Sequence, residues 1–386
     1  MRDPARLQAA IEILDEAIAA AGSNGAAADT LAQRYFASRR YAGSKDRAAV
    51  RELLFQAIRF SADRPPSGRA LMLALAEGPR PDLLPLFDGS PHAPALPEVG
   101  EPRGKPGLFP EWLRPQLQRR FGAALDREAQ ALIARAPLDL RVNALKADPA
   151  EVAAELGGKP ISSLPLGLRL EEPLPLERHP LMQSGAIEVQ DAGSQFVAAA
   201  ARAMPGETVV DLCAGAGGKT LALPADMRGE GRLVASDTDR GRLQAMRPRL
   251  ERAGLQNFVE PRLLNPGREA EALADLAGAA DLVLVDAPCS GTGTWRRNPE
   301  LRWRLTPQSL ERLLVVQARL MALGASLLKP GGRLVYAVCS VLPAEGEDQA
   351  RQACERLGLK LAGQQAYSPA GDGTDGFFVA SLGGSC

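Results

Sequence analysis

The sequence predicts an α/β protein whose C-terminal half is a doubly wound, mostly parallel sheet. From Glu207 onward, short apolar runs alternate with amphipathic stretches, which is the pattern of strands joined by crossover helices. A glycine-rich loop directly follows the first apolar run, and two later runs end in cysteines, Cys289 and Cys339. Each thiol is therefore expected at the carboxyl end of a buried strand, where open α/β sheets bind their ligands.

Length and composition set the limits of this prediction. The chain has 386 residues, so two or three domains are expected. Its 46 basic residues balance 46 acidic ones, which argues against a strongly basic coat but permits local basic patches. No apolar run reaches membrane-spanning length, and the N-terminus lacks the apolar region of a signal peptide. We expect a cytoplasmic protein with reduced thiols and no membrane partner.

The N-terminal region is predicted to be helical. Apolar residues recur at helical spacing in the first segment, from Leu7 to Ile18, and a second amphipathic stretch covers residues 46–58. Prolines and glycines then crowd residues 81–110, which is typical of a linker or an extended surface segment. We therefore predict a helical domain over residues 1–95, with a proline-rich linker to about residue 107.

A small mixed unit is expected next, over residues 108–187. Phe109-Pro110-Glu111-Trp112-Leu113 opens a helical stretch, and residues 138–143 alternate apolar and polar side chains as a half-buried strand does. Residues 188–195 then lead into an apolar helix, so the third domain is predicted to cover residues 188–386.

The elements of this third domain follow from its apolar runs and helix signals. Thr306-Pro307 supplies a cap and a first-turn proline for a long helix, which Lys329-Pro330-Gly331-Gly332 closes. The expected strands are 207–212, 231–236, 258–263, 281–285 and 333–338, and the expected helices are 218–227, 239–253 and 306–328.

The loop from Asp211 to Thr220 predicts a nucleoside site. A phosphate-binding P-loop would need a glycine where Cys213 stands, and the dinucleotide pattern would need a third glycine at Thr220. Asp237 ends the next strand, about twenty residues beyond the glycines, where an acidic side chain accepts hydrogen bonds from ribose hydroxyls. A helix-capping aspartate would look the same in sequence. The two features together favour adenosine, as in S-adenosylmethionine.

The cysteines divide into two groups. A lone cysteine is usually a small buried apolar residue, and this role is expected for Cys213, Cys354 and Cys386. No Cys-x-x-Cys pair exists, and the two histidines are remote from the cysteine motifs in sequence, so no metal site is expected. The thiols of Cys289 and Cys339 suggest two separate duties in nucleophilic chemistry.

Several motifs together resemble the RsmB/Nop/Sun family of RNA cytosine-5 methyltransferases. They are Asp211-Leu212-Cys213-Ala214 with Gly217-Gly218-Lys219-Thr220, Asp286-Ala287-Pro288-Cys289-Ser290-Gly291-Thr292-Gly293, Leu328-Lys329-Pro330-Gly331-Gly332 and Cys339-Ser340. The resemblance extends from about Leu108 to the end, and the N-terminal helices are similar in placement to the NusB-like domain of bacterial RsmB proteins. It implies a class I, Rossmann-like methyltransferase domain preceded by an RRM-like subdomain that binds RNA. It also implies S-adenosylmethionine as cofactor and RNA, most readily ribosomal RNA, as partner of a monomeric enzyme.

The resemblance assigns a role to each candidate catalytic residue. Carbon 5 of cytosine is a poor nucleophile until a thiolate adds at carbon 6, so the reaction needs a covalent nucleophile. That role falls to Cys339, release of the enzyme falls to Cys289, and Asp286 is expected to bind the cytosine amino and N3 edge. Lys219 is a candidate to orient methionine or ribose, although a surface lysine fits the pattern as well. The expected cofactor-binding residues are Cys213, Ala214, Gly215, Ala216, Gly217, Gly218, Lys219, Asp237, Arg242, Asn265 and Asp286.

The sequence departs from the family pattern in three places. Ala216 stands where a proline is usual, which removes a backbone restraint and predicts a looser loop. Asn265 replaces an acidic residue on the adenine side, where an amide can still form hydrogen bonds but binding is expected to weaken. Ala337-Val338 replaces Ser-Thr before the nucleophile, which removes a hydroxyl beside it.

Arginines and tryptophans interleave between the two cysteine motifs, in Trp295-Arg296-Arg297 and Arg302-Trp303-Arg304. Such side chains can hold phosphates and stack on unpaired bases. A solvated basic loop with two core tryptophans is the alternative. The sequence leaves three other functions open: methylation of transfer RNA, a non-catalytic role in RNA binding or ribosome assembly, and methylation of a small metabolite.

Overall fold

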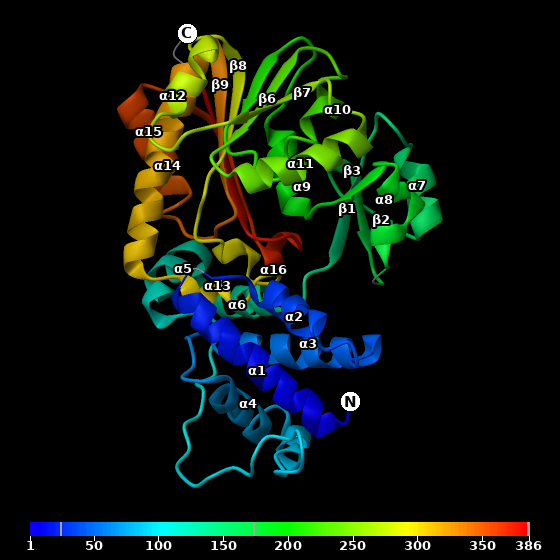
Figure 1. Ribbon diagram of the computed structural model, residues 1–386. Helices are drawn as coiled ribbons and strands as arrows, with labels where there is room; N and C mark the ends of the chain where they lie inside the picture. Colours follow the sequence, from blue (N-terminus) through cyan, green and yellow to red (C-terminus); the bar gives the residue numbers. More distant parts are fainter. Residues whose placement is uncertain (24, 173, 384–386) are drawn as a thin grey trace. The chain divides into compact units, whose positions relative to one another are not determined.

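The computed structural model describes residues 1–23, 25–172 and 174–383, and it forms two compact units (Figure 1). The first unit comprises Met1–Ala134 with Thr294–Pro307, and the second comprises Arg135–Gly293 with Gln308–Cys386. The division therefore differs from the three predicted domains, whose boundaries remain predictions. Cys386, expected to be a small buried apolar residue, lies outside the described residues. Within those residues no helix combines the length and apolarity needed to cross a membrane.

The first unit is all-helical, and α1 to α4 share one apolar core. Leu7, Ile11 and Leu14 of α1 are buried, as their helical spacing predicts, and α1 packs against α2, α3 and α4. Ser67 caps α4, a helix not predicted, by accepting a hydrogen bond from the Ala70 N–H at 3.0 Å. The helices of this unit are α1 (Asp3–Gly22), α2 (Ala28–Ala37), α3 (Ser44–Phe60), α4 (Gly68–Glu77), α5 (Arg114–Phe121), α6 (Leu125–Ile133) and α13 (Leu301–Arg304), with 3-10 turns η1 (Pro81–Leu86), η2 (Glu111–Leu113) and η3 (Gly122–Ala124).

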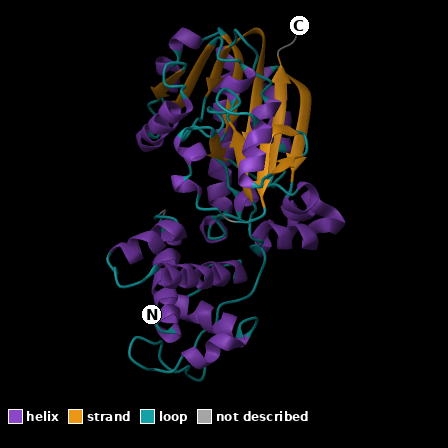
Figure 2. Cartoon of the chain, turned by 90° about the vertical axis from the view of Figure 1, so that its right-hand side faces the viewer, coloured by secondary structure: helices purple, strands orange, loops and turns teal. Residues whose placement is uncertain are grey.

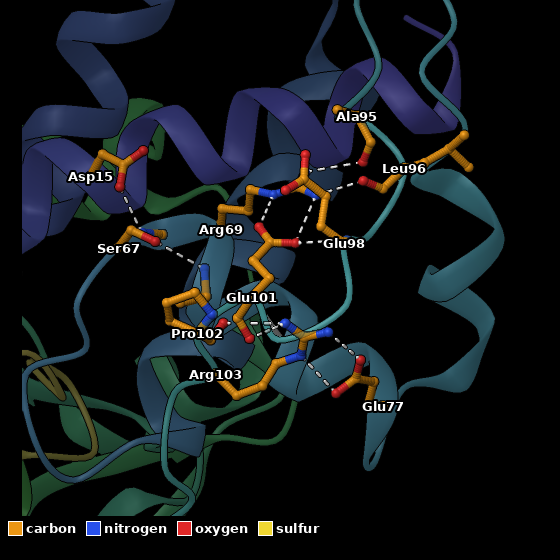
Figure 3. A network of polar contacts seen from close by, with 12 residues as sticks. Asp15, Ser67, Arg69, Glu77, Ala95, Leu96, Glu98, Glu101, Pro102 and Arg103 are labelled. Carbon is orange, nitrogen blue, oxygen red and sulfur yellow. Dashed lines mark hydrogen bonds and ion pairs between the residues drawn. The ribbon is translucent and has the colours of Figure 1, made fainter.

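The proline-rich segment is an extended strap rather than a free linker. Arg69 on α4 forms an ion pair with Glu101 and donates hydrogen bonds to the carbonyls of Ala95 and Leu96 at 3.0 and 3.1 Å (Figure 3). Arg103 pairs with Glu77, at the end of α4, at 2.7 Å. Of the two interpretations that the sequence left open, the extended surface segment is therefore the right one.

The sequence left two interpretations open for the basic and aromatic segment between the cysteine motifs. The structure supports the core position of its two tryptophans, and two of its arginines are buried as well. Trp295, Arg296, Arg302 and Trp303 are buried. Arg302 donates to the backbone carbonyls of Ile58 at 2.6 Å and Leu108 at 2.9 Å, and burial lowers the pKa of its guanidinium to about 10. These side chains hold the first unit together, so they are not available to stack on RNA bases.

The second unit contains two sheets. The smaller one is antiparallel, in the order β2-β3-β1-β4, and α7 (Pro149–Leu156) packs on it. The larger sheet has seven strands in the order β10-β11-β9-β8-β5-β6-β7, and only β11 runs antiparallel to its neighbours. Figures 1 and 2 show its twist. The strands are β1 (Leu138–Val142), β2 (Lys159–Ile161), β3 (Leu164–Leu170), β4 (Ile187–Val189), β5 (Thr208–Asp211), β6 (Arg232–Asp237), β7 (Val259–Leu263), β8 (Ala280–Asp286), β9 (Leu328–Val338), β10 (Lys360–Tyr367) and β11 (Phe377–Gly383).

Helices cover both faces of the larger sheet. Val209 and Leu282 face α9 (Ala192–Ala200) and α11 (Arg240–Ala253) in one apolar cluster. Val210 and Val283, the next residues along the same strands, lie in a second cluster with α14 (Pro307–Leu327) and α15 (Glu347–Leu357). This alternation is the signature of strands buried on both faces. The predicted Rossmann-like class is thus confirmed. The shorter helices are α8 (Pro180–Gln183), α10 (Leu223–Asp226), α12 (Glu269–Ala272) and α16 (Pro369–Asp372), with 3-10 turns η4 (Leu176–Arg178), η5 (Ala274–Leu276) and η6 (Thr292–Thr294).

One predicted element is largely wrong. The helix expected over residues 218–227 is reduced to α10, four residues long, and the chain before it is a series of turns. Gly217 has φ +85°, a left-handed conformation that no α-helix contains. Pro224 lies in the first turn of α10, the position that proline tolerates. The glycine-rich loop is therefore longer than the sequence predicted.

Candidate active site

Four strands of the larger sheet bring their carboxyl ends to one edge. β5 lies between β6 and β8, so the strand order reverses beside it, and ligands of doubly wound folds bind at such a reversal. Asp211, Asp237 and Asp286 end β5, β6 and β8, and Cys339 follows β9. β8 pairs with β9 in parallel, with Asp286 beside Ala337. The two strands that precede the cysteines are therefore neighbours in the sheet.

The two thiols are in direct contact. The Sγ atoms of Cys289 and Cys339 are 3.3 Å apart, at hydrogen-bonding distance for sulfur. The Gly293 N–H donates to the Cys339 carbonyl at 3.1 Å, which ties the two cysteine loops together. The hydrogen bond with Cys339, together with burial, raises the pKa of Cys289 well above its usual value. Cys289 therefore remains a thiol at neutral pH and can donate its S–H to the sulfur of Cys339.

A partly buried ion pair lies near Cys339. Lys219, at the end of the glycine-rich loop, donates to Asp286 Oδ2 at 2.6 Å, and its Nζ lies 5.4 Å from the Phe377 ring centroid. Burial lowers the pKa of Lys219, but the charge and hydrogen bond of Asp286 and the nearby Cys339 sulfur outweigh it, so the pKa is raised. The ammonium thus supplies a fixed positive charge next to the proposed nucleophile. No local pattern indicates this pair, because its partners are 67 residues apart.

A buried carboxylate, which the sequence reasoning missed, connects the residues that follow the two cysteines. Glu345 is fully buried and accepts hydrogen bonds from the Ser290 N–H at 2.8 Å and from Gln317 Nε2 at 2.9 Å. The hydroxyls of Ser290 and Ser340 also donate to its Oε2, and the Tyr336 hydroxyl donates to its carbonyl at 2.5 Å. One side chain therefore fixes the spacing of the two cysteine loops. The glycine and proline near Glu345 in the sequence are typical of any loop, so the sequence did not indicate this role.

The glycine-rich loop fits the nucleoside that the sequence predicted. The Asp237 carboxylate accepts hydrogen bonds from the N–H groups of Gly215 and Asp239, both at 2.8 Å. Asp237 does not cap the helix that follows, because Asp239 caps α11 by accepting a hydrogen bond from the Arg242 N–H at 3.0 Å. Each carboxylate oxygen of Asp237 still has a lone pair for a ribose hydroxyl. A Cβ added at Gly215 or Gly218 would meet no atom within 4 Å. The loop therefore borders open space where a ligand can approach its backbone, as S-adenosylmethionine would require.

The floor of the site is buried. Thr220 Oγ1 donates to Asp211 Oδ2 at 2.7 Å, and burial raises the pKa of Asp211 to about 7. Cys213 packs against the apolar cluster beneath α14, and burial raises the pKa of its thiol, in keeping with the small apolar role expected for it. Ala214 is buried beside it. The side chain of Cys213 contributes packing, so a contact with the cofactor would come from its backbone.

Two predicted cofactor residues, Arg242 and Asn265, do not bond the predicted site residues described above. Arg242 is exposed on α11, with its nearest carboxylate, Asp239, 3.9 Å away. Asn265 is exposed after β7, and its carbonyl accepts a hydrogen bond from the Arg268 N–H at 2.9 Å. Within the part of the chain that the structure describes, neither side chain bonds another predicted site residue. Their roles remain predictions.

The chain matches two protein families. Residues 198–383 match the family described as 16S rRNA methyltransferase RsmB/F. Residues 109–177 match the family described as Methyltr_RsmF/B-like, ferredoxin-like domain. The second match covers much of the region that carries the small antiparallel sheet.

Named relatives cover most of the chain. It is 34% identical over 305 residues to "Probable ribosomal RNA small subunit methyltransferase B" of Synechocystis sp., covering 72% of this chain and 67% of that protein. It is 35% identical over 295 residues to the ribosomal RNA small subunit methyltransferase B of Salmonella paratyphi B, covering 71% of this chain and 66% of that protein. The chain thus spans about two thirds of the length of these relatives. The crystal structure of a methyltransferase homologue from Pyrococcus horikoshii matches with a TM-score of 0.63 and 28% identity, over 72% of this chain and 96% of that one.

Proposed function

Because the chain belongs to the 16S rRNA methyltransferase RsmB/F family, we propose that it transfers a methyl group from S-adenosylmethionine to carbon 5 of a cytosine in RNA. The observation that carries this proposal is the thiol pair, 3.3 Å apart, beside the ion pair of Lys219 and Asp286. Ribosomal RNA of the small subunit is the proposed substrate, since the named relatives are methyltransferases of that RNA.

The first step is attack by Cys339 on carbon 6 of the target base. The sulfur forms the new bond, and the electron pair of the C5–C6 double bond shifts toward carbon 5 and the N3 edge. Lys219 stabilises the thiolate before the attack, because its positive charge lies beside the sulfur. Asp286 retains 28% side-chain exposure while bound to Lys219, so it can accept a hydrogen bond from the cytosine amino group.

The glycine-rich loop and Asp237 would hold the cofactor, which supplies an electrophilic methyl group when bound. The loop contributes its backbone and Asp237 contributes acceptors for ribose hydroxyls. The target base must be unstacked before carbon 6 is accessible, which costs a few kcal/mol in a duplex and less in a loop.

Release requires a base, for which we propose solvent water, to remove the carbon 5 proton. The C–H electron pair then re-forms the C5–C6 double bond, and the C6–S bond breaks with its electron pair returning to the sulfur of Cys339. Cys289 is suited to this step, because its protonated thiol can donate a hydrogen bond to the departing sulfur. The buried Glu345 supports the release role of Cys289, since its charge also raises the pKa of this thiol. Cys289 is therefore suited to donate a proton in the release step, while Cys339 is the proposed nucleophile.

The proposal is tested by mapping 5-methylcytosine after incubation with methyl-labelled S-adenosylmethionine and either small-subunit ribosomal RNA or transfer RNA. Wild type is expected to methylate the ribosomal RNA, Cys339→Ala to be inactive, and Cys289→Ala to accumulate a covalent protein–RNA adduct. Cys354→Ala, which changes a cysteine outside the site, serves as the control. Methylation by Cys339→Ala would overturn the nucleophile assignment. A wild-type protein that methylates neither RNA would favour a non-catalytic role in RNA binding or ribosome assembly.

A further inference from the structure

The cofactor loop consists of Gly215, Ala216, Gly217 and Gly218, three of which are glycines. Such a backbone has high conformational entropy unless other groups hold it. Asp237 holds the N–H of Gly215. The carbonyls of Ala216 and Gly218 need separate partners, because the loop has no regular secondary structure.

The Ala216 carbonyl is held by an arginine of α11. Arg249 Nη1 donates to it at 2.5 Å, and Nη2 of the same guanidinium donates to Glu188 Oε2 at 2.9 Å. Glu188 lies on β4 of the smaller sheet and is buried. The guanidinium therefore links the cofactor loop to the smaller sheet by two charge-assisted hydrogen bonds.

The helix that carries Arg249 also limits the position of the loop by packing. A Cβ added at Gly217 would lie 2.6 Å from Cγ of Met246. Met246 and Arg249 are three residues apart, so they share one face of α11. That face of α11 contacts the loop at Gly217. At Gly215 and Gly218, by contrast, an added Cβ would lie in open space.

A second polar chain reaches the Gly218 carbonyl from the same sheet. Gln190 Nε2 donates to this carbonyl at 3.1 Å. The buried Arg141 of β1 fixes Gln190 by donating to its Oε1 at 2.7 Å. Arg249 is thus one of two side chains through which residues of the smaller sheet and its C-terminal flank restrain the loop.

We propose that Arg249 is a positioning residue for S-adenosylmethionine binding: anchored by Glu188, it holds the Ala216 carbonyl and pre-orders the cofactor loop. The inference rests on the cofactor of the proposed function. The expectation that the loop is looser because Ala216 replaces a proline stays a prediction, and the guanidinium bound to the carbonyl of that residue is a restraint that the sequence did not indicate. A pre-ordered loop binds more tightly because less conformational entropy is lost on binding.

The test compares Arg249→Met with Arg247→Met, which removes an exposed arginine from the same helix. Binding of S-adenosylhomocysteine is measured by calorimetry at a temperature where circular dichroism reports folded protein. Arg249→Met is expected to raise Kd about tenfold, as for the loss of one strong hydrogen bond, and Arg247→Met is expected to leave it within about twofold. Equal Kd values for wild type and Arg249→Met would overturn the proposal.

A double variant separates positioning from stability. In Arg249→Met, the buried carboxylate of Glu188 loses its closest cationic partner. In the double variant Arg249→Met with Glu188→Gln, that buried charge is removed as well. The double variant is expected to bind no more weakly than Arg249→Met alone, because both residues act through one interaction. Additive losses would contradict the anchoring role of Glu188.

Hydrogen exchange provides a readout that does not depend on the cofactor. In protein without ligand, the amides of residues 215–221 are expected to exchange faster in Arg249→Met than in Arg247→Met. If wild type fails to bind S-adenosylhomocysteine, the proposed cofactor is wrong, and the exchange result still decides whether Arg249 holds the loop. Unchanged exchange would overturn the positioning role.

Discussion

Replacing Glu345 by alanine tests whether one buried carboxylate holds the two cysteine loops together. The Ser290 N–H and the Gln317 side chain, both buried, would lose this acceptor, and each such loss costs about 1–3 kcal/mol. The hydroxyls can pair with one another, since Thr292 Oγ1 already lies 2.9 Å from Ser340 Oγ. The truncation also leaves a small cavity. We expect the free energy of unfolding to fall by about 3–5 kcal/mol.

The conservative variant is expected to behave differently. In Glu345→Gln, the amide oxygen can still accept from Ser290 and Gln317, while the amide N–H groups can donate to the serine hydroxyls. Its cost should be about 1 kcal/mol, because only the charge of the acceptor is lost.

Urea denaturation followed by circular dichroism measures both variants against wild type. Methylation at a temperature where all three proteins are folded then reports on the site itself. Glu345→Ala is expected to lower kcat while Glu345→Gln retains most of it, since only the first removes the link between the loops. Equal unfolding free energies for the two variants would refute the hydrogen-bond reasoning. Full activity of folded Glu345→Ala would refute the role in spacing the thiols.

Three further predictions follow from the same structure. Lys219→Met should lower kcat about 100-fold or more by removing the charge beside Cys339, measured with labelled S-adenosylmethionine; an unchanged kcat would contradict this role. Arg302→Met should destabilise the first unit by about 2–4 kcal/mol in urea denaturation, because several carbonyls lose a buried donor. The control, Arg304→Met, changes a less buried arginine of the same helix and should cost about 1 kcal/mol. Equal losses of unfolding free energy for the two variants would contradict the reasoning. The pKa of Asp211 is raised from 3.8 to about 7, so its contribution to stability is fully present below about pH 4 and is lost as pH rises through about 7. Asp211→Asn should flatten the pH dependence of the thermal unfolding temperature over that window. An unchanged slope would contradict the raised pKa.

Local patterns in the sequence were sufficient for much of the larger sheet. Residues 282–285 and 334–338, which lead to Cys289 and Cys339, are apolar or aromatic because their strands are buried on both faces. A strand buried in this way is visible in a few consecutive residues. The expectation for residues 218–227 failed because Pro224 lies inside that range, where it cannot donate a backbone N–H to a continuous helix, and α10 instead has this proline in its first turn. Local composition therefore predicted these two strands correctly and the helix over residues 218–227 incorrectly.

Other features depend on contacts between distant residues. Interleaved arginine and tryptophan have the same composition on an RNA-binding surface and in a buried helix, and only the position of Arg302 under the carbonyls of Ile58 and Leu108 identifies the buried case. Glu345 likewise looks like any surface glutamate in sequence. Its four donors come from three separate segments of the chain.

The sequence by itself determined the α/β class, the nucleoside-type loop and the position of two thiols at strand ends, because strand periodicity and glycine-rich turns are local properties of the chain. Tertiary structure alone decided how the thiols differ. Lys219 lies against Asp286 beside Cys339, and Glu345 adds its charge near Cys289, only after the strands have paired. Electrostatic interaction depends on distance through space, so the chemistry that separates the two cysteines arises in the folded protein.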